Sequence, residues 1–442
     1  MDTIFIPDGI ISTAKLREAL AKVSGKRCLI YFADPQRVSI TPKSLAWLEK
    51  AVTSGTAMAY GDYEEINSQG HATPHPVTDY AEGSVRDDFN FGPVAVVSVP
   101  AMRDVLANMP EYNYACWYAV RFTLSVRSLP KHLRAVCSQL SAPEATDSEA
   151  THFAYVNPRN RAVQLELEAA FTGYLKATGA WLPERPRLSE SEIDAGYFPV
   201  EASVIIPVKN RVTTVADAVR SALGQEAPFE FNIIVVDNHS TDGTTELLQS
   251  LANDRLVHIV PEDDSHGIGG CWNLALAHPQ CGRFAIQLDS DDLYSSPDTL
   301  RRMVDCFRLE GCAMAVGSYQ LVDRNLQPLP PGVIDHREWT DANGHNNLLR
   351  VNGLGAPRGF LTSIARQTPM PDVSYGEDYA MGLQLSRRYR IGRIFDVLYL
   401  CRRWEGNSDS KLTVEKANRY NDYKDSLRTT ELEQRRRINT DD

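Results

Sequence analysis

The sequence has 442 residues, 43% hydrophobic and 23% charged, which is typical of a soluble globular protein with two or three domains. Its 46 basic and 57 acidic residues give a formal net charge of −11. Because sequence-independent binding to nucleic acid needs a basic face, this balance argues against a nucleic-acid partner. It leaves room for a local basic pocket that binds a small anion.

The first residues contain neither the basic stretch nor the long apolar core of a secretory signal, and no window approaches the ~20 apolar residues of a membrane-spanning helix. Peripheral association with a membrane remains open. The 8 cysteines are scattered through apolar stretches without a CxxC pair. We therefore expect reduced thiols in the core rather than disulfides or a zinc site, and a cytoplasmic location.

A pattern in the N-terminal part of the chain returns in its C-terminal part. Arg27, at the start of RCLIYF, aligns with Arg283, at the start of RFAIQL, an offset of 256 residues. Offsets of 255, 256 and 261 relate TPKSL to SPDTL, AYGDY to AVGSY, and YAVRFTLS to YAMGLQLS. Near-constant offsets over about a hundred residues indicate an internal repeat. Residues 1–140 are thus predicted to form a small α/β domain, in which residues 27–140 copy a half-domain at 283–405.

Residues 141–198 are predicted to connect this domain to a second one. The first ten, SAPEATDSEA, are typical of a loop, and Ala162–Lys176 has the apolar spacing of a helix. Pro183–Glu190 returns to a loop-like composition. The second domain is therefore predicted to span residues 199–410.

In the second domain, nearly all-apolar strands alternate with helices, which predicts an α/β fold with a mostly parallel sheet covered on both faces. The predicted strands are Ala202–Val208, Phe231–Val236, Val257–Val260, Phe284–Leu288 and Phe395–Leu400. The predicted helices are Thr213–Leu223, Glu246–Leu251 and Ile268–Ala277. Residues 411–442 are charged and poor in apolar side chains, so we predict a C-terminal helix on the surface.

Asp289 and Asp291 directly follow the predicted strand Phe284–Leu288. Two carboxylates in this spacing at a strand end can converge on one hard divalent cation, which in turn can bridge a diphosphate. An isolated pair of this kind more often marks the start of a helix, and the sequence SPD, which suits a helix start, follows closely. Since ligands of open α/β sheets bind at the carboxyl ends of strands, the position favours metal binding here.

Two further polar segments follow strands or open helices. Asp237 ends the second predicted strand and could accept hydrogen bonds from a nucleobase or ribose, although it and Asp242 also suit a turn. Gly267–Gly270 opens a helix whose N–H groups could face an anion, but it lacks the spacing of a dinucleotide or triphosphate loop. Each of these signals is weak by itself.

Four charged residues stand near the end of the second domain. Glu377 and Asp378 begin a helical stretch. A carboxylate beside a metal-bound phosphate could act as a general base, whereas the simpler interpretation is an acidic helix start. Arg402 and Arg403, after the last predicted strand, could neutralise a departing diphosphate or lie in solvent.

Taken together, ASVIIPVKN, VVDNHSTDGT, LDSDD and GEDY, in this order, resemble family 2 glycosyltransferases, which have the GT-A fold: a Rossmann-like mixed sheet with helices on both faces. The resemblance covers about residues 200–405. It implies an inverting enzyme that moves a sugar from a nucleoside-diphosphate sugar, usually a UDP-sugar, to an acceptor hydroxyl during assembly of a surface glycan. A Mn²⁺ or Mg²⁺ ion is the implied cofactor.

The resemblance also implies roles for individual residues. The nucleotide would be bound by Pro207, Asn210, Asp237, Asn238, Asn273 and Asp289. The metal would be held by Asp289 and Asp291, the diphosphate by Arg402 and Arg403, and the acceptor proton by Asp378 as general base with Glu377 beside it.

The sequence departs from the family pattern in three places. Asn238 stands where the family has a second aspartate, and Trp272 stands where it often has an arginine. Leu400 replaces the glutamine of a Gln-x-x-Arg-Trp signature that otherwise keeps Arg403 and Trp404. Many members place a histidine near this last position as a further metal ligand, a role that tryptophan cannot fill.

The N-terminal copy lacks the chemistry of the second domain. Under the alignment, Ala33 falls near Asp289 and Trp117 falls on Asp378, so neither the metal ligand nor the base is present. We predict an inactive half-domain that either helps to bind acceptor or only packs. Two alternatives to a transferase stay open: a pseudoenzyme that binds nucleotide or glycan without transfer, and a nucleotidyltransferase.

Overall fold

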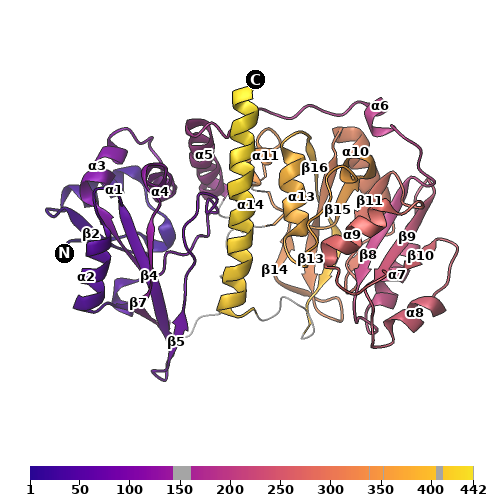
Figure 1. The fold of residues 1–442 in the computed structure, drawn as a ribbon, viewed down its shortest axis with the longest axis horizontal. Helices are drawn as coiled ribbons and strands as arrows, with labels where there is room; N and C mark the ends of the chain where they lie inside the picture. The colour runs from indigo at the N-terminus through magenta and orange to yellow at the C-terminus, as the bar shows by residue number, and fades with distance from the viewer. Residues whose placement is uncertain (143–160, 338, 352, 405–411, 442) are drawn as a thin grey trace.

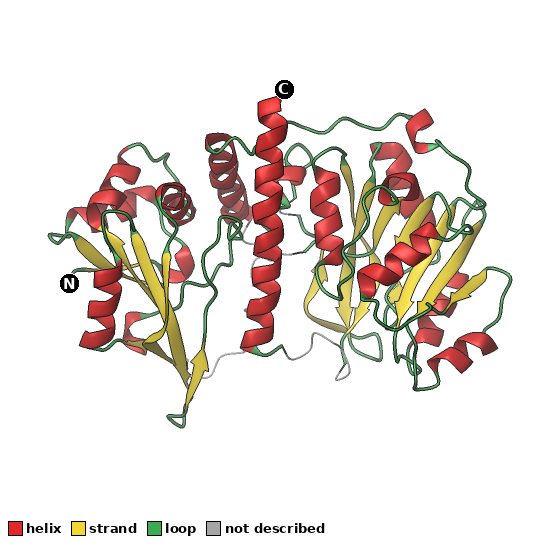
Figure 2. Ribbon diagram, in the orientation of Figure 1, coloured by secondary structure: helices red, strands yellow, loops and turns green. Residues whose placement is uncertain are grey.

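The computed structural model describes residues 1–142, 161–337, 339–351, 353–404 and 412–441. Two mixed sheets stand side by side along the long axis of the molecule, and the C-terminal helix runs between them (Figure 1). Helices lie on both faces of each sheet (Figure 2). No helix in these ranges is long and apolar enough to cross a membrane.

The second domain is built on a nine-stranded sheet. Its strands are β8 (Ala202–Val208), β9 (Phe231–Asp237), β10 (Leu256–Ile259), β11 (Phe284–Gln287), β12 (Leu293–Tyr294), β13 (Met314–Val322), β14 (Pro328–Ile334), β15 (Arg358–Leu361) and β16 (Ile391–Arg402). They are ordered β10-β9-β8-β11-β15-β13-β16-β12, with β14 paired to β13. Strands β10, β9, β8 and β11 are parallel, β15 is antiparallel to both of its neighbours, and β13 and β16 are parallel.

The helices of this domain cover both faces of the sheet. They are α7 (Val215–Leu223), α8 (Thr244–Ser250), α9 (Ile268–Ala277), α10 (Thr299–Glu310), α11 (Gly344–Asn347), α12 (Thr362–Ala365) and α13 (Glu377–Ser386). Along β8, Val204 packs into a cluster with Val215 and Leu300, whereas Ile205 packs on the other side with Trp272. Both faces of the strand are therefore buried, which explains its continuous apolar sequence.

The N-terminal domain is built on a seven-stranded sheet. Its strands are β1 (Thr3–Phe5), β2 (Arg27–Tyr31), β3 (Val38–Ser39), β4 (Met58–Ile66), β5 (Ala72–His75), β6 (Val94–Ser98) and β7 (Lys131–Ser141), and its helices are α1 (Thr13–Ala21), α2 (Pro42–Ala51), α3 (Val99–Ala107) and α4 (Cys116–Arg127). The strand order is β1-β2-β6-β4-β7-β3, with β5 paired to β4.

The two sheets share their connectivity. In each, an inner strand is antiparallel to its first neighbour and parallel to its second: β4 lies between β6 and β7, and β13 lies between β15 and β16. Ala59 pairs with Lys131, and Ala315 pairs with Gly392, which reproduces the sequence offsets of 256 and 261. The register of both parallel pairs also shifts at equivalent places. The N-terminal sheet thus repeats the part of the second sheet that runs from β11 to β16.

Each copy is followed by a helix that packs on its last helix. Helix α5 (Arg161–Ala177) packs on α4, and α14 (Val414–Asp441) packs on α13. The helix predicted in the connector is therefore present, together with a short α6 (Glu190–Ile193), and Phe171 and Leu175 of α5 are buried. From residue 143 to 160, the predicted loop lies outside the described residues.

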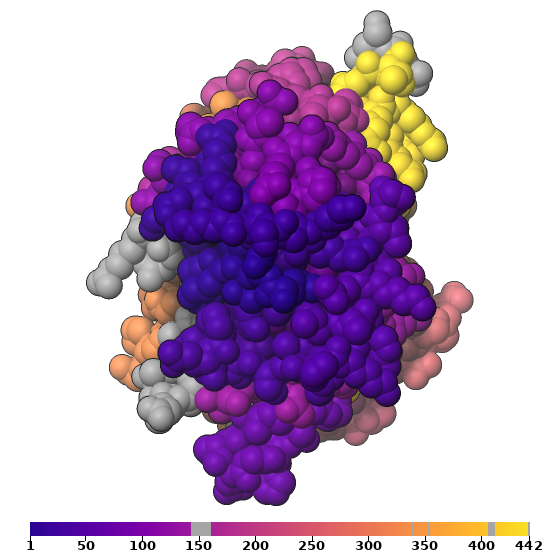
Figure 3. Space-filling view, turned by 90° about the vertical axis from the view of Figure 1, so that its left-hand side faces the viewer, coloured from indigo at the N-terminus to yellow at the C-terminus, as the bar shows by residue number. Residues whose placement is uncertain are grey.

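Helix α14 has an exposed face, as its charged sequence predicts, but it is not only a surface helix. One face is buried between the two domains, and Arg428, Leu432 and Arg435 on this face are fully inaccessible to solvent. The charges are tolerated there because acidic side chains of the same helix pair with them: Arg428 with Asp425 at 2.6 Å and Arg435 with Glu431 at 2.9 Å. Viewed from the N-terminal domain, the end of α14 projects past the edge of that domain (Figure 3).

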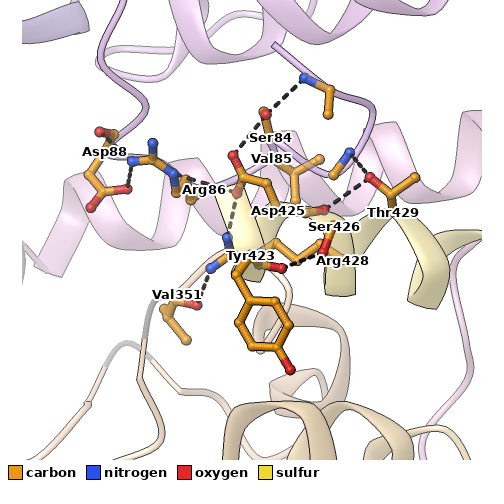
Figure 4. A network of polar contacts seen from close by, with 12 residues as sticks. Ser84, Val85, Arg86, Asp88, Val351, Tyr423, Asp425, Ser426, Arg428 and Thr429 are labelled. Carbon is orange, nitrogen blue, oxygen red and sulfur yellow. Dashed lines mark hydrogen bonds and ion pairs between the residues drawn. The ribbon is translucent and has the colours of Figure 1, made fainter. Parts of the chain in front are cut away.

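A buried polar network joins the N-terminal domain, α14 and the second domain (Figure 4). The carboxylate of Asp425 accepts hydrogen bonds from the Ser84 hydroxyl at 2.8 Å and from Arg428 at 2.6 Å. The guanidinium of Arg86 approaches the same carboxylate to 3.6 Å. Arg428 also donates to the Val351 carbonyl at 3.1 Å. One carboxylate thus connects three parts of the molecule.

Candidate functional site

A cavity of about 1890 Å³ lies between the two domains. Its wall on the side of the second domain includes Asp289, Arg358 and Asp378, and α14 contributes Lys424. Its opposite wall belongs to the N-terminal domain and includes Trp117. The volume exceeds the roughly 300–1,000 Å³ of a small-molecule pocket. The cavity therefore has room for more than one ligand.

The fold brings the two predicted acidic motifs together. The Gln287 side chain, at the end of β11, donates to both carboxylate oxygens of Asp289 at 2.9 and 3.0 Å. Its carbonyl oxygen accepts from the backbone N–H of Arg358 at 3.2 Å. The Arg358 guanidinium in turn contacts the Asp378 carboxylate at 2.9 Å. Gln287 and Arg358, which the motif analysis missed, thus connect Asp289 to Asp378 through three consecutive links.

The loop after β11 holds three carboxylates close together. Burial, with the neighbouring Asp289 carboxylate, raises the pKa of Asp291, and burial raises the pKa of Asp292 well above its usual range. Arg211 approaches the Asp291 carboxylate to 3.8 Å, and the charges of Arg211 and Arg402 only partly offset the rise in its pKa. The carboxylates repel one another, and a bound cation would lower this repulsion.

The oxygen ligands fit a divalent cation that is shared with a substrate. In the described ranges, no three His, Cys, Asp or Glu residues are grouped as a complete metal site. Asp289 and Asp291 offer only two carboxylates, and Mg²⁺ is commonly bound by one or two carboxylates plus substrate phosphates and water. The donor set therefore fits such an ion in the presence of a diphosphate ligand.

Arg402 and Arg403 have different surroundings. The backbone N–H of Arg402 donates to the Asp292 carboxylate at 2.7 Å, its Nε–H donates to the Asp291 carbonyl, and its guanidinium contacts Asp217 at 3.2 Å. Arg402 is only 7% exposed. Arg402 therefore stabilises the acidic loop without lining the cavity, whereas Arg403 lines it.

Glu377 lies at the first turn of α13 and is buried. One of its carboxylate oxygens has no hydrogen-bond partner among the described residues. Burial, and then the neighbouring Asp378 carboxylate, raise the pKa of Glu377 to about 8. Glu377 is thus protonated at neutral pH.

Glu377→Gln is expected to gain stability relative to the wild type as the pH rises. The folded protein holds the Glu377 proton up to about pH 8, and the reference pKa is 4.5, so the stabilisation from this group is present below pH 4.5 and is lost as the pH rises through about 8. Melting curves of both proteins at about pH 6 and about pH 9 measure the change, with the exposed Glu226→Gln as control. An equal difference at both pH values would contradict the raised pKa.

Helix α14 places a buried lysine at the cavity. Lys424 is 7% exposed and lies over the rings of Tyr375 at 4.5 Å and Tyr379 at 5.3 Å. Burial lowers the pKa of Lys424 to about 8, although the nearby charges of Asp378 and Glu377 oppose this shift. Local sequence gave no signal for Lys424, because the charged segment that carries it was expected to face solvent.

The residues predicted for the nucleotide lie around the ends of β8 and β9. Pro207 is half-buried in β8, and the Asn210 side chain accepts from the backbone of Thr241 at 2.8 Å. Asp237 is fully buried, and its carboxylate accepts from the Ser240 backbone at 3.1 Å. In this structure, Asn210 and Asp237 therefore stabilise the loops at the strand ends, and neither lines the cavity.

The other two predicted asparagines also make internal contacts. Asn238 donates to the His266 carbonyl at 2.7 Å, and its own carbonyl oxygen is buried without a partner in the described part of the chain. Asn273 donates to the Met370 carbonyl at 2.8 Å and accepts from the Met370 N–H at 3.0 Å. Asn273 thus fixes a loop to α9, whereas Asn238 keeps one acceptor unused.

The start of α9 does not present its free N–H groups to an external anion. The Asp372 carboxylate accepts from the backbone N–H of Gly267 at 2.6 Å and of Gly270 at 3.1 Å. The Asp372 carboxylate therefore occupies the anion-binding position that the glycine-rich helix start was predicted to offer to a ligand.

A sequence model of glycosyl transferase family 2 matches residues 203–351. The putative teichuronic acid biosynthesis glycosyltransferase TuaG of Bacillus subtilis is 34% identical over 188 residues, which are 42% of this chain and 72% of TuaG. The poly(ribitol-phosphate) beta-N-acetylglucosaminyltransferase TarS of Staphylococcus aureus is 34% identical over 101 residues, 22% of this chain and 17% of TarS. The chain spans only 31% of an uncharacterized glycosyltransferase of Rickettsia felis.

Two solved structures are also similar. TarS residues 1–349 in complex with UDP-GlcNAc align with a TM-score of 0.40 and 21% identity, over 48% of this chain and 62% of that one. The mannosyltransferase PcManGT of Pyrobaculum calidifontis, in complex with GDP-Man and Mn²⁺, aligns with a TM-score of 0.37 and 16% identity, over 61% of this chain and 83% of that one. The match to TuaG, 34% identical over 72% of that protein, is sufficient to assign the family. With a second domain of the GT-A fold, the chain belongs to glycosyl transferase family 2.

Proposed function

We propose that this chain transfers a sugar from a nucleoside-diphosphate sugar, with UDP as the nucleotide, to an acceptor hydroxyl with inversion at the anomeric carbon. The observation that carries the proposal is the line of contacts from Asp289 through Gln287 and Arg358 to Asp378, on the wall of one cavity. It supports one site that holds a diphosphate at one end and a base at the other. The names of TuaG and TarS favour a cell-surface glycan as the product, assembled from the cytoplasmic side.

On the donor side, Asp289 and Asp291 would hold a Mn²⁺ or Mg²⁺ ion against the diphosphate. When bound, such an ion stabilises the negative charge that develops on the departing diphosphate. Arg403 lines the cavity and would add a positive charge there. Arg402 would act indirectly, by holding the backbone of the acidic loop in place.

On the acceptor side, Asp378 would take the proton of the acceptor hydroxyl. The oxygen of that hydroxyl would attack the anomeric carbon from the face opposite the phosphate. The ion pair with Arg358 at 2.9 Å orients the carboxylate. Glu377 is protonated at neutral pH, so it adds no second negative charge beside Asp378.

A binding protein without transfer is the second candidate. The Asp378 carboxylate is already paired with the Arg358 guanidinium at 2.9 Å, so it would have to share or break this contact to accept a proton. Hydrolysis of a UDP-sugar by the full chain in the presence of Mn²⁺ supports a transferase, whereas nucleotide binding without any turnover supports the binding protein.

Asp291→Ala is expected to weaken UDP binding in the presence of Mn²⁺ by about tenfold or more, because one of the two carboxylates for the shared ion is lost. Calorimetric titration of UDP with and without Mn²⁺ measures the effect. Asp305→Ala, which removes an exposed carboxylate of α10, is the matched control and should bind as the wild type does. Equal Mn²⁺-dependent affinity in Asp291→Ala and the wild type would refute the metal assignment.

A further inference from the structure

The two copies of the repeat face each other across the cavity. Ala33 follows β2 as Asp289 follows β11, and Trp117 begins α4 as Asp378 begins α13, at the offsets of 256 and 261. All four residues line the same cavity. In the N-terminal copy, the position that corresponds to the catalytic site therefore opens into the same cavity. It forms the opposite wall of the site.

The chemistry of this opposite wall differs from that of the catalytic wall. Phe32 is half-buried, and its ring packs on those of Trp117 at 5.3 Å and Phe91 at 6.0 Å, which are each only 4% exposed. Ile10, 43% exposed, extends the apolar surface, and Asn90 adds amide groups beside it. Aromatic rings beside hydrogen-bonding groups suit a ligand with one apolar face and one polar edge.

The charges of the wall are largely balanced. Asp87 pairs with Arg350 at 2.6 Å, and Asp88 pairs with Arg86 at 2.8 Å. A strongly anionic polymer would meet these carboxylates without a surplus of cationic groups, so the wall favours a neutral ligand. A neutral saccharide meets each condition, since its ring carries an apolar C–H face and a rim of hydroxyls.

We propose that the N-terminal copy is an acceptor-binding site, in which Ile10, Phe32 and Asn90 contact a neutral saccharide chain and the buried Trp117 supports the ring of Phe32. The inference rests on the proposed function only for the direction of this chain, whose terminal hydroxyl would point toward Asp378. The size of the cavity supports it, because about 1890 Å³ leaves space beyond what a nucleotide-sugar on the catalytic wall occupies. Loss of the carboxylate at Ala33 and of the base at Trp117 thus converts a catalytic surface into a binding surface.

The test uses the full chain, without donor, on an array of neutral oligosaccharides built from hexoses and N-acetylhexosamines, with polyanionic glycans on the same array. The wild type is expected to bind neutral oligosaccharides. Ala33→Trp, which fills the N-terminal side of the cavity from a half-buried position, should lower this binding at least about tenfold. Ala72→Trp, on an exposed position of β5 in the same domain, is the matched control and should bind as the wild type does.

Thermal stabilisation by UDP with Mn²⁺ shows that each variant is folded and should be the same in all of them. Ile10→Ala, a change at an exposed position, is a second variant and should lower saccharide binding several-fold. An array without neutral binders, binding to polyanionic glycans alone, or unchanged binding by both cavity variants would overturn the inference. Saccharide binding that is lost in Ala33→Trp supports it even if the wild type turns over no UDP-sugar, a result that would refute only the proposed function.

Discussion

Asp378→Asn is expected to lower sugar transfer by about 10²–10⁴-fold, the usual contribution of a general base. The change removes the group that accepts the proton but keeps the size of the side chain. Donor binding should persist, because Asp289 and Asp291 are untouched and the contact between Gln287 and Asp289 does not involve Asp378. Release of UDP from a UDP-sugar, and a separate titration with UDP, measure the two effects.

Asp396→Asn is the matched control for this prediction. It makes the same chemical change on an exposed carboxylate of β16, which pairs with Arg302 at the surface. Its turnover should equal that of the wild type. Turnover by Asp378→Asn at the wild-type rate would show that another group accepts the proton.

Asp425→Ala is expected to cost about 3–5 kcal/mol of unfolding free energy, as the loss of one partner from a buried ion pair commonly does. Arg428 is fully buried and Arg86 is 3% exposed, and both would lose their contact with the carboxylate. The Ser84 hydroxyl would lose its acceptor as well. Urea denaturation followed by circular dichroism measures the change.

The control removes an ion pair of the same composition at the surface. Asp104 and Arg127 pair across α3 and α4 with both side chains more than half exposed. Asp104→Ala should therefore cost less than about 1 kcal/mol. If Asp425→Ala were no more destabilising than Asp104→Ala, the network in Figure 4 would not hold the domains together.

Local sequence patterns were sufficient for most of the fold. The runs Ala202–Val208 and Ile268–Ala277 form a strand and a helix with the predicted bounds. Buried strands of a parallel sheet are apolar throughout, so their limits are visible wherever polar residues begin. The repeat was detectable because corresponding strands and helices keep similar sequences at nearly constant offsets. The structure shows the same correspondence in strand pairing: Ala59 pairs with Lys131 as Ala315 pairs with Gly392.

The position of α14 was not predictable from its composition. A charged segment normally faces solvent, and nothing local indicates that Asp425 and Glu431 neutralise the arginines that the helix buries. Those pairs form three and four residues apart on one helix face, but only the packing of two domains decides that this face is inside.

The candidate site shows the same division. Asp289 and Asp378 were found because each follows a strand or opens a helix in a recognisable motif. Arg358 and Lys424 were missed, because each reaches the site from a distant element and carries no motif. Conversely, Asp237 matches a family motif and was predicted to bind the nucleotide. In this structure its carboxylate accepts a hydrogen bond from the Ser240 N–H in the adjoining turn.

The order of elements in the chain has a consequence for how the cavity is made. Helix α14 follows both sheets in the sequence, yet it supplies Lys424 to the cavity wall and Asp425 to the joint between the domains. During synthesis each sheet can fold as it leaves the ribosome, since its own strands and helices are complete. The compartment between them closes only after α14 emerges. We therefore expect a nascent chain that has both acidic motifs to stay unable to use a nucleotide-sugar until its final described helix has docked.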